Sequence, residues 1–316
     1  MVLRRYIDMN RKSFIKAGAL TLGALALTNQ RLIAGLLGQP ESKIKMLTND
    51  IGIFVERGGP MLFYMGKDSN VVVDAQWPEQ ATSLIDELKK RNNRPIELLI
   101  NTHHHIGNTS GNITFKDKTK QILAHENSKR NQLTNSRLMK TENKQAYPTI
   151  TYKETWCQKF GKENVCVYHY GPAHTNGDSI IHFEYNDIVH MGDVVHNRQH
   201  PAIDRVGGGS LKKWAEALPK IYNDFGKNTK FVFGHAANGF DYVGTREDLR
   251  LFSNYLGQLI IHVENEIKRG LSKKELIKSA TDVVPGSNPQ WKGEGLGRTY
   301  ASAYDEISYY QALQDQ

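Results

Sequence analysis

Residues 101–112 read NTHHHIGNTSGN and directly follow the apolar run Ile96–Ile100. The run has the length and composition of a buried strand, and the stretch after it, rich in glycine and asparagine, is typical of a loop. His103 and His105 are two residues apart, so they can converge on one ion where the backbone turns just past the strand. Because neutral imidazole is the commonest metal ligand, the stretch predicts a metal site at a strand's carboxyl end.

Three later fragments place further ligand-type side chains in turns next to predicted strands. They are GPAHTNGDS around His174, HMGD ending in Asp193, and FVFGH ending in His235. Loops at the ends of a rigid sheet are where binding and catalytic residues gather. We therefore expect these side chains to belong to the same site as the histidine stretch.

The rest of the pattern predicts short strands alternating with amphipathic helices. The predicted strands are 42–46, 51–56, 60–64, 70–74, 96–100, 118–125, 179–184, 188–191 and 230–233, with a hairpin over 149–169 that turns at 160–163. The predicted helices are 78–91, 126–138, 211–225, 245–268 and 272–279. The sequence shows no linker and no repeat at a solenoid period, so the pattern predicts one α/β domain over residues 42–316.

In this order, the four fragments resemble the motifs of the metallo-β-lactamase superfamily. Further agreement comes from VVVD at 71–74, AHEN at 124–127, PAIDRVGGG at 201–209 and TREDL at 245–249, the last two being similar to a subgroup of exported bacterial metallo-hydrolases. The resemblance covers roughly residues 52–260. It implies a four-layer αββα sandwich with the metals in a cleft at one edge of the two sheets.

The histidine stretch departs from the family's usual HxHxDH pattern after His105. Gly107 stands where the family has an aspartate that binds the second metal, and Asn108 stands where it has the following histidine. A second metal site therefore lacks two of its usual side chains.

The resemblance implies that His103, His105 and His174 bind the first metal, that Asp193 bridges to the second metal and that His235 binds the second metal. If Asp193 is not a bridge, it could be a fourth ligand or a base for the bound water, and His235 could orient the substrate or donate a proton to the leaving group. Three histidines and a carboxylate meet the ligand count of a catalytic zinc, whereas Asp193 and His235 are too few for another ion. We therefore predict a single zinc ion.

We expect other roles for the remaining polar residues near these motifs. His196 and His200 follow Asp193 in a loop that lines the family's cleft, so either could replace a missing ligand of the second site, and Asp204 is a weaker candidate. His104 is expected to be a packing or exposed residue, since neighbouring side chains of an extended segment point to opposite sides. Structural roles, including bracing of loops and ligands, are expected for His125, His169, His182, His262, Asp74 and Asp178.

These features predict a metal-dependent hydrolase in which one zinc activates water for attack on a small ester, lactam, thioester or phosphodiester-type substrate, with Asp193 and His235 as catalytic residues. The fold does not choose among these bonds. One alternative is a catalytically impaired descendant that binds a metal or small ligand, because Gly107 and Asn108 are what such a loss would leave. Another is a mononuclear iron oxygenase, since histidines and a carboxylate can hold iron(II).

The N-terminal segment has the pattern of an export signal. The stretch NRKSFIK at residues 10–16 precedes an apolar run from Ala17 to Leu27, which contains the small-residue cleavage candidate ALA at 24–26. NRKSFIK resembles a twin-arginine signal with Lys12 in place of the second arginine, and an uncleaved amphipathic helix is the alternative. The run is short for a bilayer. We therefore predict a leader over 1–41, a periplasmic location and no stable membrane span in the mature chain.

The charge distribution bears on nucleic-acid binding, and the cysteine content bears on disulfide formation. Half of the net charge of +8 lies in the first sixteen residues, and no basic stripe with interleaved aromatics follows, so we expect no nucleic-acid partner. Cys157 and Cys166 are the only cysteines, and the hairpin predicted around them would place them opposite each other. In an oxidising compartment they could form a disulfide, but a shift of one residue in register would leave two buried thiols instead.

Overall fold

Two mixed β-sheets pack face to face in the structure, which is a computed structural model that describes residues 43–281, 283–291 and 294–314. Both sheets belong to one unit, Ile44–Gln316. The leader predicted over residues 1–41 lies outside the described residues. Among the helices of the described part, none is long and apolar enough to cross a membrane.

The first sheet has seven strands, whose spatial order is their order along the chain. They are β1 (Ile44–Met46), β2 (Ile51–Phe54), β3 (Met61–Met65), β4 (Asn70–Val73), β5 (Ile96–Ile100), β6 (Thr119–His125) and β7 (Ile150–Tyr152). Strands β1 to β4 pair antiparallel, and β4 to β7 pair parallel. The carboxyl ends of β4, β5 and β6 therefore lie at one edge, and the histidine stretch starts there.

The second sheet has six strands in the order β15-β13-β11-β10-β9-β8. They are β8 (Thr155–Phe160), β9 (Glu163–Tyr168), β10 (Ile180–Phe183), β11 (Ile188–His190), β13 (Lys230–Val232) and β15 (Val243–Gly244). Strands β11 and β13 are parallel. Beyond their carboxyl ends, β12 (His196–Asn197) and β14 (His235–Ala236) form a short parallel pair. This topology carries the loops of Asp193 and His235 to the same edge of the sheet.

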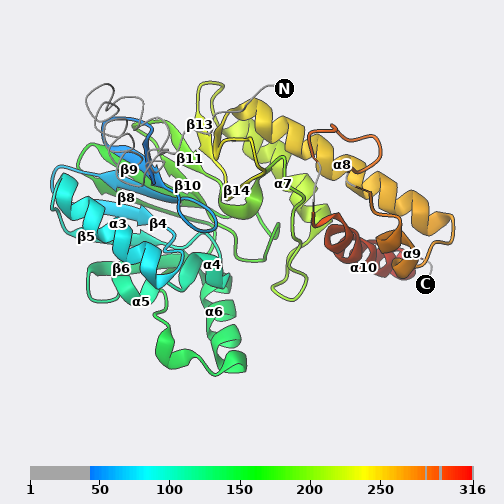
Figure 1. Cartoon of the computed structure of the whole chain (residues 1–316), viewed down its shortest axis with the longest axis horizontal. Coiled ribbons are helices and arrows are strands. Elements are labelled where there is room, and N and C mark those ends of the chain that lie inside the picture. The colour runs from blue at the N-terminus through cyan, green and yellow to red at the C-terminus, as the bar shows by residue number, and fades with distance from the viewer. Residues whose placement is uncertain (1–42, 282, 292–293, 315–316) are drawn as a thin grey trace, which may run out of the picture. The chain divides into compact units, whose positions relative to one another are not determined.

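Helices cover the outer faces of both sheets (Figure 1). The helices are α3 (Pro78–Arg91), α4 (Ile106–Thr109), α5 (Asn112–Phe115), α6 (Glu126–Met139), α7 (Leu211–Asp224), α8 (Arg246–Lys268), α9 (Lys273–Lys278) and α10 (Leu296–Gln314), with the 3-10 turns η1 (Glu142–Lys144) and η2 (Gly192–Val194). In β3, Leu62 and Tyr64 face the core between the sheets, whereas Met61 and Phe63 face α3. The chain therefore has the αββα sandwich that the sequence predicts.

Local sequence explains the best-predicted helices. Helix α3 has exactly the predicted bounds, begins with Pro78 and buries Leu84 and Leu88 on one face. Helix α8 is opened by a capping box between Thr245 and Asp248, as the sequence suggests.

Several features of the fold were not predicted, among them two short helices, the place of β7 and the last helix. Helices α4 and α5 occupy the stretch expected to be a loop, β7 joins the first sheet instead of extending the hairpin, and α10 follows α9. A signal for α10 exists, because its buried residues Leu296, Tyr300, Ala303 and Ile307 recur at helical spacing.

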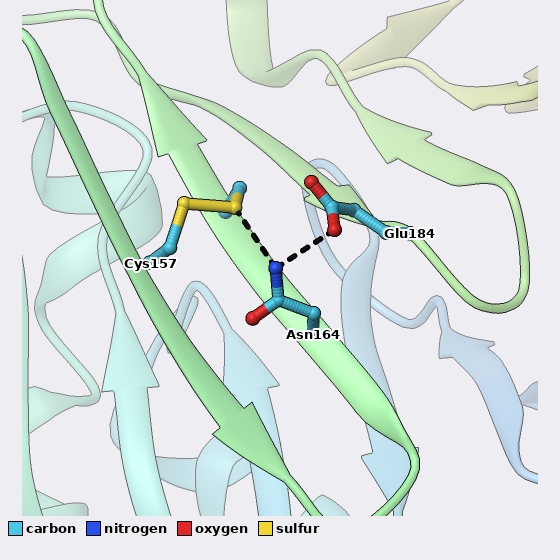
Figure 2. The surroundings of a disulfide bond; sticks show 4 residues. Cys157, Asn164 and Glu184 are labelled. Atoms are coloured by element: carbon cyan, nitrogen blue, oxygen red, sulfur yellow. Dashed lines mark hydrogen bonds between the residues drawn. A yellow bond between two sulfur atoms is a disulfide. The ribbon is translucent and has the colours of Figure 1, made fainter.

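The hairpin of β8 and β9 settles the question of the two cysteines. Its register places Cys157 directly opposite Cys166, with Cα atoms 4.2 Å apart, and the two are joined by a disulfide. The amide of Asn164 donates to Glu184 Oε2 over 2.7 Å and to the sulfur of Cys166 over 3.4 Å. Figure 2 shows Asn164 between the disulfide and Glu184. The sequence left open a disulfide or two buried thiols, and the structure contains the disulfide.

Candidate functional site

Three imidazoles from two distant segments converge past the end of β5. His103 and His105 lie in the turn between β5 and α4, and His174 lies in the loop between β9 and β10. Nδ1 of His105 lies 3.1 Å from Nε2 of His103 and 3.0 Å from Nε2 of His174. The rings are nearly perpendicular to one another, so their edges, not their faces, meet at one point.

The partners of His174 and His105 determine which ring nitrogen carries the proton. Nδ1 of His174 lies 2.7 Å from the carbonyl oxygen of Ala202, which can only accept, so this nitrogen donates and Nε2 has a bare lone pair. Nε2 of His105 lies 2.8 Å from Oδ2 of Asp204 and donates to it. In the neutral ring, Nδ1 of His105 is therefore the bare nitrogen.

His103 is also held in a tautomer with one bare ring nitrogen, in this case by the hydroxyl of Thr102. Its Nδ1 lies 3.0 Å from Oγ1 of Thr102, and that hydroxyl donates to Oδ2 of Asp74 over 2.7 Å. Because its only hydrogen is used on Asp74, the hydroxyl accepts from Nδ1 of His103, and Nε2 is left bare. The expectation that Asp74 braces the histidine stretch agrees with these contacts.

The three bare nitrogens fit a bound cation. Burial lowers the pKa of His103 well below its ordinary value and that of His174 to about 4, so both are neutral at neutral pH. Burial also lowers the pKa of His105, but its hydrogen bond to Asp204 and the charge of Asp193 raise it overall. If His105 is protonated on Nδ1, that N–H can donate to Nε2 of His103 or to Nε2 of His174, but not to both. Since lone pairs that face one another repel, a metal ion ligated by all three satisfies the arrangement better.

Asp193 lies beside this cluster, in η2 after β11. Its Oδ2 is 3.7 Å from Nε2 of His103 and 3.5 Å from Nε2 of His174, and its buried Oδ1 has no hydrogen-bond partner among the described residues. One candidate ligand atom from each of His103, His105, His174 and Asp193 lies within 4.8 Å of the others. The structure thus brings together all four predicted ligands in a group able to hold a metal.

His235 contacts the same carboxylate oxygen of Asp193 that lies near His103 and His174. Its Nε2 lies 3.1 Å from Oδ2 of Asp193, whose charge raises the pKa of His235 while burial opposes the shift. Burial raises the pKa of Asp193, but the charges of His235 and His103 bring it well below its usual range. Gly234 permits this contact, because a Cβ there would collide with Oδ1 of Asp193 and lie 2.6 Å from the carbonyl oxygen of Gly192.

The two further second-site candidates occupy different surroundings. His196 in β12 stacks on His235 at 4.9 Å between ring centroids, is buried, and has no hydrogen-bond partner for either ring nitrogen among the described residues. Nδ1 of His200 lies 2.7 Å from the hydroxyl of Tyr255 on α8. No group of potential ligands in the described part of the chain combines either histidine with Asp193 and His235.

His104 contacts Asp204, a residue of the site, which was not expected. It is buried, and its Nε2 lies 3.3 Å from Oδ2 of Asp204, the oxygen that also accepts from His105. The three residues form a second group with ligand atoms close enough for a metal. Sequence reasoning gave Asp204 only a minor place, and neither its bracing of His105 nor the Ala202 carbonyl was foreseen.

The fold and this cluster together define a class of protein. A family model described as "Metallo-beta-lactamase superfamily" matches residues 57–235, which is more than half of the chain. The chain belongs to this superfamily.

Relatives and solved structures agree with this membership. The chain is 21% identical to "Metallo-beta-lactamase type 2" of Elizabethkingia meningoseptica over 225 residues, which are 68% of this chain and 87% of the relative. It is 24% identical to "Metallo-beta-lactamase IND-1" of Chryseobacterium indologenes over 175 residues, 55% of this chain and 70% of the relative. In structure it is similar to a metallo-beta-lactamase from Pontibacter korlensis (TM-score 0.56, 17% identity, 68% of this chain and 98% of that chain). The DIM-1 metallo-beta-lactamase gives the same TM-score and identity over 69% and 98%.

Proposed function

We propose that the chain is a metal-dependent hydrolase that holds one zinc ion on His103, His105 and His174, with Asp193 beside it. The observation that supports this most strongly is the convergence of three bare imidazole nitrogens, in which Nε2 of His103 and Nε2 of His174 lie 3.1 Å and 3.0 Å from Nδ1 of His105. Imidazole and carboxylate are typical zinc ligands. When bound, zinc would activate a water molecule and polarise a carbonyl or phosphoryl oxygen of the substrate.

A single ion is proposed because the second site lacks ligands. Gly107 has no side chain to offer, and the amide of Asn108 donates to Oδ2 of Asp74 over 2.9 Å. Only Asp193 and His235 are left at that position, and two ligands do not hold zinc firmly.

Asp193 and His235 are proposed to move protons. Asp193 can accept a proton from the attacking water, because its Oδ1 is not used by any hydrogen bond in the described residues. His235 has a raised pKa and is 35% exposed, so it can hold a proton and donate it to a leaving group arriving from solvent. The substrate is proposed to be a small ester, lactam, thioester or phosphodiester. Lactams come first in a screen because the matched relatives are named metallo-beta-lactamases.

A catalytically impaired metal- or ligand-binding protein is the second candidate, and the engagement of Asn108 by Asp74 favours it. One experiment separates the candidates: metals are counted in the purified chain by elemental analysis, and chromogenic lactams, esters and phosphodiesters are screened with and without chelator. About one zinc per chain with chelator-sensitive turnover supports the hydrolase. Metal without turnover supports the impaired protein, and iron with oxygen consumption would indicate an oxygenase instead.

We also propose that residues 1–41 are an export leader, that residues 42–316 are the functional domain and that the mature chain acts in the periplasm. The proposal rests on the NRKSFIK stretch and the apolar run that follows it. Cell fractionation and N-terminal sequencing of the secreted form test it. Recovery of the intact chain from the cytoplasm alone would contradict it.

A further inference from the structure

A fully buried carboxylate from the C-terminal helix contacts a segment next to the cluster of His103, His105 and His174. Glu306 lies on α10, outside the part of the chain that the family model matches. We call residues 201–212, which lie between β12 and the first turn of α7, the supporting segment. Glu306 accepts hydrogen bonds from Ser210 Oγ at 2.6 Å, Leu211 N at 2.7 Å, Lys212 N at 3.2 Å and Arg205 Nη1 at 3.0 Å.

A second buried polar side chain of α10 contacts the other end of the supporting segment. Thr299 is seven residues before Glu306, and therefore lies two turns away on the same face of the helix. Its hydroxyl donates to the carbonyl oxygen of Pro201 over 2.7 Å. Both side chains are at most 1% exposed. Helix α10 thus fixes the start and the end of the supporting segment.

Between these two attachment points the segment supplies the groups that orient two of the three converging imidazoles. The carbonyl of Ala202 accepts from Nδ1 of His174, and the carboxylate of Asp204 accepts from Nε2 of His105. The backbone N–H of Asp204 also donates to the carbonyl oxygen of His174 over 3.0 Å. A shift of the segment would therefore change the orientation of both rings.

We propose that Glu306 and Thr299 are positioning residues of the metal centre, which act by holding the supporting segment where its groups orient His174 and His105. This inference rests on the metal site of the proposed function. Loss of a group that orients a ligand typically costs 10- to 100-fold in metal affinity.

Apolar side chains pack α10 in the core in addition to these two polar residues. The helix already buries Leu296, Tyr300, Ala303 and Ile307 in the core beneath the second sheet. Replacing both members of a buried ion pair by apolar residues is often neutral for stability, whereas removing one member leaves its partner uncompensated. The four hydrogen bonds of Glu306 all go to the supporting segment, so removing the charge should affect the segment before it affects the docking of the helix.

The test measures cobalt(II) and zinc affinity and the visible spectrum of the cobalt(II) form of the full chain. For Glu306→Gln we expect at least a tenfold loss of affinity and an altered cobalt spectrum. Thr299→Val should lose affinity in the same direction, and Thr299→Ser, which keeps the hydroxyl, should retain it. Asp305→Asn is the matched control, because this exposed neighbour on α10 pairs with Lys273, away from the supporting segment.

A second readout needs no metal. Long-range ¹H–¹⁵N spectra of the metal-free chain should show His174 protonated on Nδ1 in the unsubstituted protein and a mixed or exchanging ring in Glu306→Gln. If Glu306→Gln does not fold, the two Thr299 variants decide the question. Unchanged affinity and ring state in folded variants would overturn the positioning role alone. A chain that binds no metal before any substitution would overturn the proposed function and this role together.

Discussion

The side-chain amide of Asn108 donates a hydrogen bond to Oδ2 of Asp74 over 2.9 Å. The same oxygen accepts from the hydroxyl of Thr102, which in turn orients His103. Burial raises the pKa of Asp74 to about 7, and these hydrogen bonds oppose that shift. Asn108, at the position where the family usually has a histidine, thus helps to brace His103, a proposed ligand of the first site.

Restoring the missing side chains should create a second metal site. Gly107→Asp introduces a side chain whose Cβ meets no heavy atom within 4 Å, and Asn108→His replaces the amide that contacts Asp74. With Asp193 and His235 already adjacent, we expect the double variant to bind about two zinc ions per chain in place of one. Elemental analysis after dialysis measures the count, and Gly107→Asp alone serves as the intermediate case. A folded double variant that still binds one ion would show that this side of the cluster cannot hold metal.

Removing one converging imidazole should abolish the first site. His174→Ala deletes a bare nitrogen 3.0 Å from Nδ1 of His105, and two histidines with Asp193 remain. We expect metal affinity to fall by more than about 100-fold, since even the loss of an orienting partner costs 10- to 100-fold. His262→Ala on α8 is the control and should keep metal content unchanged. Isothermal titration with zinc makes the comparison, and equal affinity of both variants would exclude His174 as a ligand.

The glycine before His235 should tolerate no side chain. A Cβ at Gly234 would collide with Oδ1 of Asp193, so Gly234→Ala must displace this carboxylate or the β14 backbone. We expect loss of turnover and destabilisation by about 1–3 kcal/mol from overpacking. Gly257→Ala is a matched control, because a Cβ there meets nothing within 4 Å and the residue lies inside α8. It should stabilise the fold by up to about 1 kcal/mol in urea unfolding. Similar effects of both substitutions would contradict the clash.

Much of the site could be predicted because its side chains follow strands with clear period and composition. His103, His105, Asp193 and His235 each come within a few residues of the end of an apolar run, and the ends of these strands meet at one edge of their sheets. The role of Ala202 had no sequence signature, since it acts through a backbone carbonyl. The contact of His104 with Asp204 was missed because the turn after β5 ends the strict alternation of an extended chain.

Other parts depend on contacts between segments far apart in the sequence. Glu306 contacts the supporting segment across about a hundred residues of chain, and a glutamate within a helical pattern is usually a solvated surface residue. The pairing of Cys157 with Cys166 required the exact register of the hairpin, which spacing alone did not fix.

Removing the disulfide should destabilise the fold without changing metal binding at the histidine cluster. Cys157 and Cys166 close a short loop, because they are nine positions apart. The restriction of the unfolded chain by such a loop is worth about 2–3 kcal/mol. We expect the Cys157→Ser, Cys166→Ser variant to lose that much in urea unfolding while binding zinc as before. The reduced, unsubstituted chain provides the control and should unfold like the variant. A loss of metal binding in either would indicate that the hairpin contributes to the site.

The start of α6 should respond to pH through His125. Its Nδ1 accepts from the backbone N–H of Asn127 over 3.2 Å and caps the helix, while its Nε2 donates to the carbonyl of Lys153 over 2.9 Å. Burial, together with the nearby ring of His169, lowers the pKa of His125 to about 4. A protonated ring would lose the capping acceptor and place a positive charge at the helix N-terminus.

Because the pKa in the folded chain lies below the unfolded value of about 6.5, the unfolded state binds more protons between these two values. Stability contributed by His125 is therefore complete above pH of about 6.5 and is lost as the pH falls toward 4, by less than about 3 kcal/mol. The measurement compares urea unfolding of the unsubstituted chain and His125→Gln from pH 7 to 4.5, both in the presence of chelator. The unsubstituted chain should lose more stability over this interval, because a glutamine cannot titrate but can still accept from Asn127. Parallel pH profiles of the two proteins would show that the ring of His125 titrates alike in the folded and unfolded states.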